Sequence, residues 1–165
     1  TALGQQADGY MSAGKLVPDS VVIGLVAERL TQGDAQRGFI LDGFPRTVPQ
    51  AEALEALLGE RGLPLTHVLQ IDVPHELLVE RATLRRTDKR TGQIYHLKYS
   101  LPPPDAELEH RADDREETVR RRLDEYDAMT AALLPFYGQR GLLRRVDGVG
   151  KPEEVTARIS NELEQ

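Results

Sequence analysis

Cysteine and tryptophan are both absent from the 165 residues of this chain. Without cysteine, the chain can form no disulfide bond, no thiolate metal site and no cysteine nucleophile. Disulfides are common in small secreted domains and rare in reducing compartments, so their absence favours a cytoplasmic protein. The absence also leaves no sulfur ligands for a structural zinc ion, and we expect none.

A long apolar segment and a positive net charge are lacking too. No apolar run approaches the roughly 20 residues that a membrane-spanning helix needs, and the first residues do not resemble a signal peptide. Lysine and arginine together number 21 against 27 acidic residues, which gives a net charge of −6. We therefore expect neither a membrane nor a nucleic acid as a partner. We also expect the protein to be a monomer.

Lysine is scarce, because the chain has only four lysines beside 17 arginines. Nine of the arginines fall between positions 81 and 122. The planar guanidinium group can bind a phosphate or a carboxylate through two parallel hydrogen bonds. A polyanionic ligand would explain the cluster, but a GC-rich genome and solvated helix faces would explain it as well. Composition leaves both interpretations open.

Strand-like apolar runs alternate with helical spacing along most of the chain. The pattern predicts buried strands at residues 38–42, 66–72 and 142–146. It predicts helices at residues 18–33 and 49–62, and two more that begin at residues 74 and 152. Such an alternation is typical of an α/β fold in which helices cover both faces of a parallel sheet.

One segment, residues 87–104, interrupts this alternation with the pattern of a β-hairpin whose turn is Thr91-Gly92. Its strand residues would be Ile94, Tyr95, Leu97 and Tyr99. A long helix is predicted next, over residues 114–139, with a kink caused by Pro135 near its end. The chain thus predicts a small β insertion between two helices, each of which carries arginine close to the insertion.

The most informative stretch is the loop Asp42-Gly43-Phe44-Pro45-Arg46, which directly follows a predicted buried strand. In open α/β sheets, ligands bind beyond the carboxyl ends of the strands. Asp42 would therefore present a carboxylate to the ligand crevice, Gly43 would permit close backbone approach, and Arg46 could bind a phosphate. An isolated Asp-Gly turn would more simply cap a helix, but the ten-residue string GFILDGFPRT argues for a ligand site.

The longer string GFILDGFPRTVPQAEAL closely resembles the signature of the adenylate kinases, in the nucleoside monophosphate kinase family. The resemblance extends over essentially the whole chain in family order, through AGKLVPDSVV (13–22), DVPHELLVERATLRR (72–86), TGQIYHLKY (91–99), RADDREETVRRRLDEY (111–126) and VDGVGKPEEV (146–155). It implies a P-loop-kinase-like α/β fold with a hairpin lid. It also implies reversible, Mg²⁺-dependent transfer of a phosphoryl group from ATP to AMP, which gives two ADP.

The resemblance further implies roles for individual residues around AMP. Arg46 would hold the AMP phosphate, and Gln50 would hydrogen-bond to the adenine. Asp42 would help to order Mg²⁺ through water. The full AMP side implied by the resemblance is Leu16, Val17, Gly43, Arg46, Gln50, Arg111 and Arg122.

Other residues are implied on the ATP side and around the transferring phosphoryl group. Arg81 would lie against the ATP adenine, with Tyr95 and His96 of the lid nearby, and Lys151 would flank the base through its backbone. Arg85 would bind ATP and close on the phosphates. The catalytic set implied by the resemblance is Arg46, Arg85, Arg111, Arg122 and, at the lid hinge, Asp113 and Asp114.

The same resemblance divides the chain into parts. Residues 1–35 would be part of an AMP-binding helical region, and residues 87–112 would form the lid. Residues 36–86 and 113–165 would form the core. Some relatives hold the lid with four cysteines around zinc, which this chain cannot do.

The sequence also lacks the phosphate-loop motif G-x-x-x-x-G-K-[ST]. Family members carry it near the start of the chain, after a strand that lies centrally in the sheet. We therefore expect a gap between the strands at 38–42 and 66–72, with unpaired backbone groups. We also expect these 165 residues to be a portion of an adenylate kinase that is inactive without that segment.

Two other functions remain open. A UMP/CMP-type kinase would have a lid of only a few residues, whereas residues 86–110 offer 25. A non-catalytic nucleotide-binding module could have lost some of the ligand arginines, but all of those implied by the resemblance are present. Both observations favour the adenylate kinase interpretation.

Overall fold

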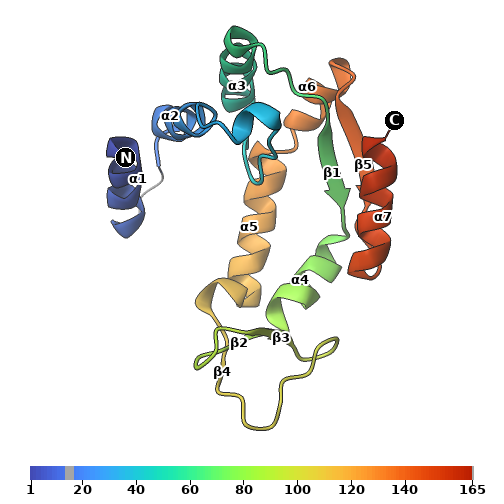
Figure 1. Ribbon diagram of the computed structural model, residues 1–165. Helices are drawn as coiled ribbons and strands as arrows, with labels where there is room; N and C mark the ends of the chain where they lie inside the picture. Colours follow the sequence, from blue (N-terminus) through green and yellow to red (C-terminus); the bar gives the residue numbers. More distant parts are fainter. Residues whose placement is uncertain (14–16, 165) are drawn as a thin grey trace.

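The computed structural model describes residues 1–13 and 17–164 (Figure 1). Its first part contains helices α1 (Ala2–Ser12) and α2 (Asp19–Arg29), the short 3₁₀ helix η1 (Ala35–Arg37) and helix α3 (Val48–Arg61). Helices α1 and α2 pack on each other, and α2 also contacts α3. Figure 1 shows α1 and α2 set to one side of the rest of the chain.

A parallel pair of strands forms the centre of the α/β part. Strand β1 (Val68–Asp72) pairs with β5 (Leu143–Asp147), so that Val68 lies opposite Leu143 and Asp72 opposite Asp147. Helix α4 (His75–Thr83) follows β1, and helix α7 (Pro152–Leu163) follows β5 and packs against it. The predicted α/β fold with a parallel sheet and packed helices is confirmed.

The segment 38–42 is not a strand in the structure, which corrects that part of the prediction. It is extended but has no sheet partner among the described residues, and Ile40 is 94% exposed. Its neighbours Phe39 and Leu41 pack instead against a buried cluster that includes Leu54 and Leu58 of α3. The apolar run at 38–42 therefore correctly indicates that this segment packs against the core. A strand additionally needs a neighbouring chain about 4.8 Å away, and no described segment lies there.

Helix α3 contacts two buried clusters through one apolar stripe, since Ala51, Leu54 and Leu58 are three and four residues apart. Leu54 and Leu58 pack with Leu30 and Ala35 in the first cluster. Ala51 packs in the second with Leu133 and Tyr137 of helix α6, next to the first residues of β1 and β5. The helix is capped at its start by Thr47 and ends at Gly62, whose φ of +64° suits glycine. Its placement fixes the loop that precedes it.

The segment that the resemblance implies as a lid, called the lid below, contains a small antiparallel sheet in which β2 (Arg85–Asp88) lies between β3 (Ile94–His96) and β4 (Leu108–Glu109). The predicted hairpin turn is confirmed, with Gly92 at φ +73°. Its predicted strand is too long, because Leu97 and Tyr99 lie in the turn after β3. The pairing of β4 with β2 was not predicted from the sequence.

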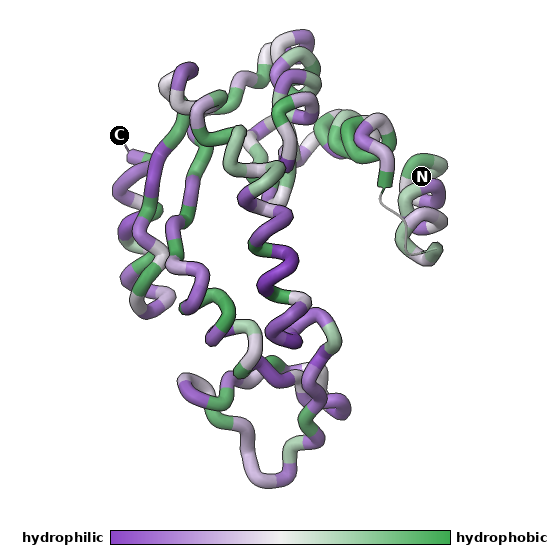
Figure 2. The backbone as a smooth tube through the Cα atoms, turned by 180° about the vertical axis from the view of Figure 1, so that it is seen from behind, coloured by the Kyte–Doolittle hydropathy of each residue, from purple (hydrophilic) through white to green (hydrophobic). Residues whose placement is uncertain are grey.

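The predicted long helix is two helices, α5 (Glu116–Met129) and α6 (Leu133–Gln139). The break precedes Pro135 because proline lacks an N–H and its ring clashes with the carbonyl four residues earlier. Proline is tolerated in the first turn of α6, where an N–H would have no partner inside the helix. Helices α4 and α5 pack together toward the lid (Figure 1), and Figure 2 shows that α5 is largely hydrophilic.

Within the described residues, none of the helices combines the length and the apolar character needed to cross a membrane.

Candidate functional site

The loop between the segment 38–42 and helix α3 is held by contacts within itself. Gly43 has φ +71°, and Arg46 folds back so that its Nε donates to the Gly43 carbonyl at 2.8 Å. A β-carbon at position 43 would lie 3.2 Å from an Arg46 Nη, so glycine also leaves room for that guanidinium. Asp42 is exposed at the end of the extended segment. The loop thus presents a carboxylate and a guanidinium within a few residues.

Gln50 lies at the start of α3 and is only 8% exposed. Its Oε1 accepts a hydrogen bond from the backbone N–H of Arg46 at 2.8 Å. Its Nε2 donates to a carboxylate oxygen of Asp19, at the start of α2, at 2.7 Å. The structure therefore joins Gln50 and Arg46 as the sequence suggested and adds Asp19. No spacing pattern pointed to Asp19, which lies 31 positions away from Gln50.

The two chain connections of the lid meet at an ion pair. The Arg85 guanidinium donates to both carboxylate oxygens of Asp114, through Nε at 3.0 Å and through Nη2. Asp114 is 1% exposed, and the hydrogen bonds from Arg85 hold its pKa below the usual range of a carboxyl although burial opposes this. The pKa of Arg85 is raised by the same contact. Next to it, Arg111 lies 3.3 Å from Asp113.

Arg81 reaches from the last turn of α4 to the loop that follows β5. Its two Nη atoms lie 3.5 and 3.4 Å from the carbonyl oxygen of Gly148. Gly148 is itself buried, and its N–H donates to the Asp72 carbonyl at 2.8 Å. Lys151, at the end of this loop, donates its backbone N–H to Glu154 at 2.9 Å. The structure thus places Arg81 against the loop that contains Lys151.

His96 and Tyr95 lie in strand β3 of the lid, and both are half-buried. The His96 Nδ1 accepts the N–H groups of Lys98 and Tyr99 at 3.1 and 3.2 Å, and its ring stacks on Tyr99 at 4.7 Å. Because Nδ1 is an acceptor, the proton of the neutral ring is on Nε2. That atom is buried without a hydrogen-bond partner among the described residues. It is a donor still available to an acceptor.

Three consecutive arginines on α5 differ in their contacts. Arg120 forms ion pairs with Glu76 and Glu116, and Arg121 lies 3.9 Å from Glu125. Arg122 is exposed and has no ion pair or hydrogen bond among the described residues. Of the three, only Arg122 is among the residues that the resemblance implies at the site.

Val17, which the resemblance implies beside the AMP base, is half-buried. Leu16, which the resemblance places beside it, lies outside the described residues.

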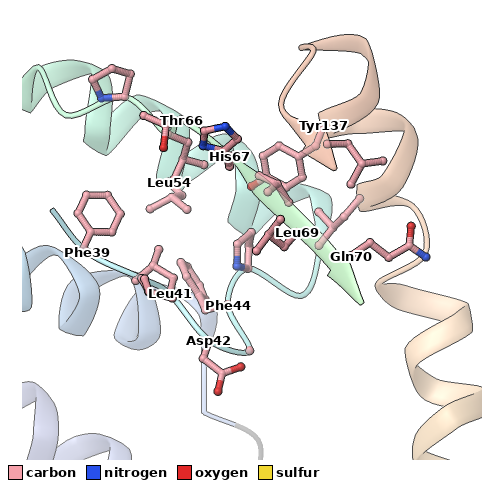
Figure 3. A pocket seen from close by; sticks show the side chains of 18 of the residues that line it. Phe39, Leu41, Asp42, Phe44, Leu54, Thr66, His67, Leu69, Gln70 and Tyr137 are labelled. Carbon is pink, nitrogen blue, oxygen red and sulfur yellow. The ribbon is translucent and has the colours of Figure 1, made fainter. Parts of the chain in front are cut away.

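A mainly apolar cavity of about 760 Å³ lies between the segment 38–45 and strand β1 (Figure 3). Consecutive residues of β1, from its start to Gln70, line the cavity, which therefore runs along the strand edge that β5 does not cover. Gln70 Oε1 and the Tyr137 hydroxyl are buried there without hydrogen-bond partners in the described part of the chain. Burial raises the pKa of Tyr137. Asp42 lies at one end of this cavity in Figure 3.

The side chains implied at the site are mostly guanidinium groups, which bind anions and not metal ions. Guanidinium groups come from the loop at Arg46, the lid connections at Arg85 and Arg111, and the helix α5 at Arg122. Residues 1–13 and 17–164 contain no group of three or more His, Cys, Asp or Glu side chains arranged to hold a metal ion. A metal at Asp42 would therefore need ligands beyond those residues, such as water and the phosphates of a nucleotide.

Comparisons with known proteins point to one family. A family model described as "Adenylate kinase" matches residues 1–142. The adenylate kinase of Sorangium cellulosum is 63% identical over 152 residues, an alignment that covers 90% of this chain and 71% of that protein. The adenylate kinase of Carboxydothermus hydrogenoformans is 47% identical over 172 residues, covering 100% of this chain and 80% of that protein. The adenylate kinase of Archaeoglobus fulgidus is 46% identical over 172 residues, covering 100% and 79%.

Proposed function

This chain belongs to the adenylate kinase family, and on that premise we propose that its function is the reversible transfer of a phosphoryl group from ATP to AMP, giving two ADP. The observation that carries the proposal is the set of arginines at both chain connections of the lid. Phosphoryl transfer needs little covalent help from a protein, but it needs the reactants aligned and the phosphate oxygens surrounded by positive charge. Guanidinium groups at the base of a closing lid meet that need.

Arg85 and Arg111 would supply charge from the lid connections. Each already has a carboxylate neighbour, Asp114 for Arg85 and Asp113 for Arg111. The guanidinium group of arginine has five N–H donors. A carboxylate that binds some of these donors holds the guanidinium in place and leaves the other donors available to a phosphate. We propose that Asp113 and Asp114 act by positioning these arginines, and that Arg122 approaches the same phosphates from α5.

The AMP site would be formed by the loop before α3 together with α2. Arg46, held by the Gly43 carbonyl, keeps both Nη groups available for a phosphate. Gln50 would hydrogen-bond to the adenine edge. Leu16 and Val17 would line the base on the side of α2.

The ATP base would lie between α4 and the loop after β5. Arg81 and this loop are already in contact through Gly148, and a flat guanidinium can stack on a purine. Lys151 would flank the base through its backbone. Tyr95 and His96 would approach from the lid, where His96 Nε2 is a buried donor without a partner in the described residues.

Magnesium would be held at Asp42 through water. An exposed carboxylate fits this use, since Mg²⁺ in phosphotransferases keeps several waters and binds through one or two carboxylates and the substrate phosphates. The ion would neutralise charge on the β- and γ-phosphates. Asp42 would orient one or two of the ion's waters.

The apolar cavity would be filled by a further strand, which the 165 residues do not contain. A strand inserted there would hydrogen-bond with the free edge of β1 and with the extended segment 38–42. It would also cover the buried polar atoms of Gln70 and Tyr137. We propose that this strand leads into the phosphate loop, and that activity requires it because backbone N–H groups of such a loop bind the ATP phosphates. Without it, the fragment would be inactive.

The proposed setting is simple. The absence of cysteine supports a place in the cytoplasm, and the net charge of −6 supports a monomer with no nucleic-acid or membrane partner. The partners would be ATP, AMP and ADP.

A coupled spectrophotometric assay of the full-length protein with MgATP and AMP, CMP, UMP or GMP tests the proposal. We expect AMP to be the preferred acceptor. Preference for UMP or CMP would instead indicate the pyrimidine-specific kinases, which the three-stranded lid argues against. Nucleotide binding without turnover for any acceptor would indicate a non-catalytic module.

A further inference from the structure

Gln50 can recognise adenine only if its carboxamide faces the right way. Adenine presents an acceptor at N1 and a donor at its 6-amino group, whereas hypoxanthine presents a donor at N1 and an acceptor at O6. A carboxamide can be turned by 180° about its last bond, which exchanges its donor and its acceptor. An unrestrained glutamine could therefore bind either purine. Selectivity for adenine requires something that fixes the amide.

Two neighbours fix the orientation of the Gln50 amide in this structure. One can only accept a hydrogen bond and the other can only donate one. The Asp19 carboxylate only accepts, so the atom 2.7 Å from it is Nε2. The backbone N–H of Arg46 only donates, so the atom 2.8 Å from it is Oε1. Turning the amide would place Oε1 against a carboxylate and the NH₂ group against an N–H. Both contacts would become repulsive in a side chain that is 8% exposed.

The fixed amide still has capacity for a base. Nε2 has two hydrogens, and Asp19 takes one of them. Oε1 has two acceptor positions, and the Arg46 N–H uses one of them. One donor and one acceptor remain, and a donor next to an acceptor is the pattern that complements N1 and the 6-amino group of adenine.

We propose that Asp19 is a specificity-determining positioning residue, which sets the Gln50 carboxamide to accept AMP and to reject nucleotides with a 6-oxo purine. The inference rests on the proposed function, because it takes the AMP base to lie at Gln50. Asp19 also begins helix α2, where an acidic side chain stabilises the helix dipole in any case. If Asp19 only stabilised helix α2, its replacement would affect all acceptor nucleotides equally. A change in the preference between acceptors therefore distinguishes the positioning role from the structural role.

The test compares AMP with inosine 5′-monophosphate (IMP), which differs only in the edge that Gln50 would contact. In the full-length protein, kcat/KM for each acceptor is measured in the wild type and in Asp19→Asn. Asparagine keeps the size but can offer either an oxygen or an NH₂ group to Gln50. We expect the preference for AMP over IMP to fall about tenfold or more, mainly through better use of IMP, because one charge-assisted contact no longer opposes the turned amide.

Two control variants sharpen the comparison. Asp19→Glu retains an acceptor-only carboxylate and should keep most of the AMP preference. Asp124→Asn removes the same charge from an exposed position on α5 and should leave both acceptors unaffected. Equilibrium binding of AMP and IMP, measured by calorimetry without ATP, should give the same ratio as the kinetic assay.

An unchanged AMP preference in Asp19→Asn would overturn the inference, and so would a parallel loss for AMP and IMP. In either case the wild type would still prefer AMP, and the proposed function would stand. A wild-type protein that bound neither nucleotide would overturn the proposed function, and the inference with it.

Discussion

The pair between Arg85 and Asp114 makes a quantitative prediction about stability. Asp114 is 1% exposed, and both of its carboxylate oxygens accept from Arg85, whose side chain is 40% exposed. A hydrogen bond between charged groups contributes about 1.5–3 kcal/mol, but solvent at the guanidinium screens part of that. We expect a coupling free energy of about 2 kcal/mol between the two side chains.

The single substitutions should not be equally costly. Arg85→Leu leaves a buried carboxylate without its partner and should lower the free energy of unfolding by about 3 kcal/mol. Asp114→Asn leaves a guanidinium that reaches water and a side chain that still accepts one hydrogen bond. It should cost about half as much. The order of the two effects follows from which partner is buried.

The assay is a double-mutant cycle in which each full-length variant is unfolded with urea and followed by circular dichroism. The exposed pair of Arg29 and Asp34 provides a control, since it is also joined by two hydrogen bonds, at 2.9 and 2.5 Å, but more than half of each side chain is exposed. Its coupling should be much smaller. Equal couplings for the two pairs, or a larger cost for Asp114→Asn than for Arg85→Leu, would refute the reasoning from burial.

Three further predictions concern turnover, packing and pH. Arg46→Ala should raise the KM for AMP by tenfold or more, whereas Arg122→Ala should mainly lower kcat in the coupled assay. Gly148→Ala should destabilise the protein by about 1–3 kcal/mol in urea unfolding, because its new methyl group would lie 2.5 Å from the side chain of Val73. The lowered pKa of Asp114 stabilises the fold above the ordinary carboxyl pKa, and this contribution is lost as the pH falls through the lowered value. Between pH 5 and pH 2, the wild type should therefore lose more unfolding free energy than Asp114→Asn.

Each of these has an outcome that would contradict it. Equal and small effects of Arg46→Ala and Arg122→Ala would remove both from the site. Gly59→Ala is the control for the glycine substitution, since a β-carbon at that helical position meets nothing within 4 Å. A Gly148→Ala protein as stable as Gly59→Ala would show that the loop after β5 adapts. Parallel acid curves for the wild type and Asp114→Asn would show that Asp114 has an ordinary pKa.

The sequence predicts the elements whose signals are local. The alternation of strands and helices identifies β1 and β5, and Thr91-Gly92 identifies the lid turn, because hydrophobic period and turn chemistry act over a few residues. The string from Gly38 to Arg46 predicts a ligand loop, since its glycine, proline and charged residues are adjacent in the chain. Even the absence of pairing at 38–42 was expected, because the sequence lacks the motif that follows the neighbouring strand in the family.

Long-range contacts are not predictable in this way. The hydrogen bond between Asp19 and Gln50 joins two helices that no short-range pattern links. Strand β4 pairs with β2 through only two residues, Leu108 and Glu109, which is too short to show a period. The break before α6 lies earlier in the chain than the predicted kink at Pro135, because a proline ring excludes the carbonyl of a residue that precedes it by one turn.

The bond between Arg85 and Asp114 closes a loop of chain, because the two residues lie 29 positions apart and bracket the lid. The lid sheet has strands that pair only with one another among the described residues. Its two ends are joined by this pair, and Lys98 and Tyr99 of the lid also bond to Glu80 of α4. Opening its backbone hydrogen bonds therefore does not require α4 or α5 to unwind. We therefore expect the amide hydrogens between Thr87 and Glu109 to exchange with deuterium more readily than those of β1 and β5.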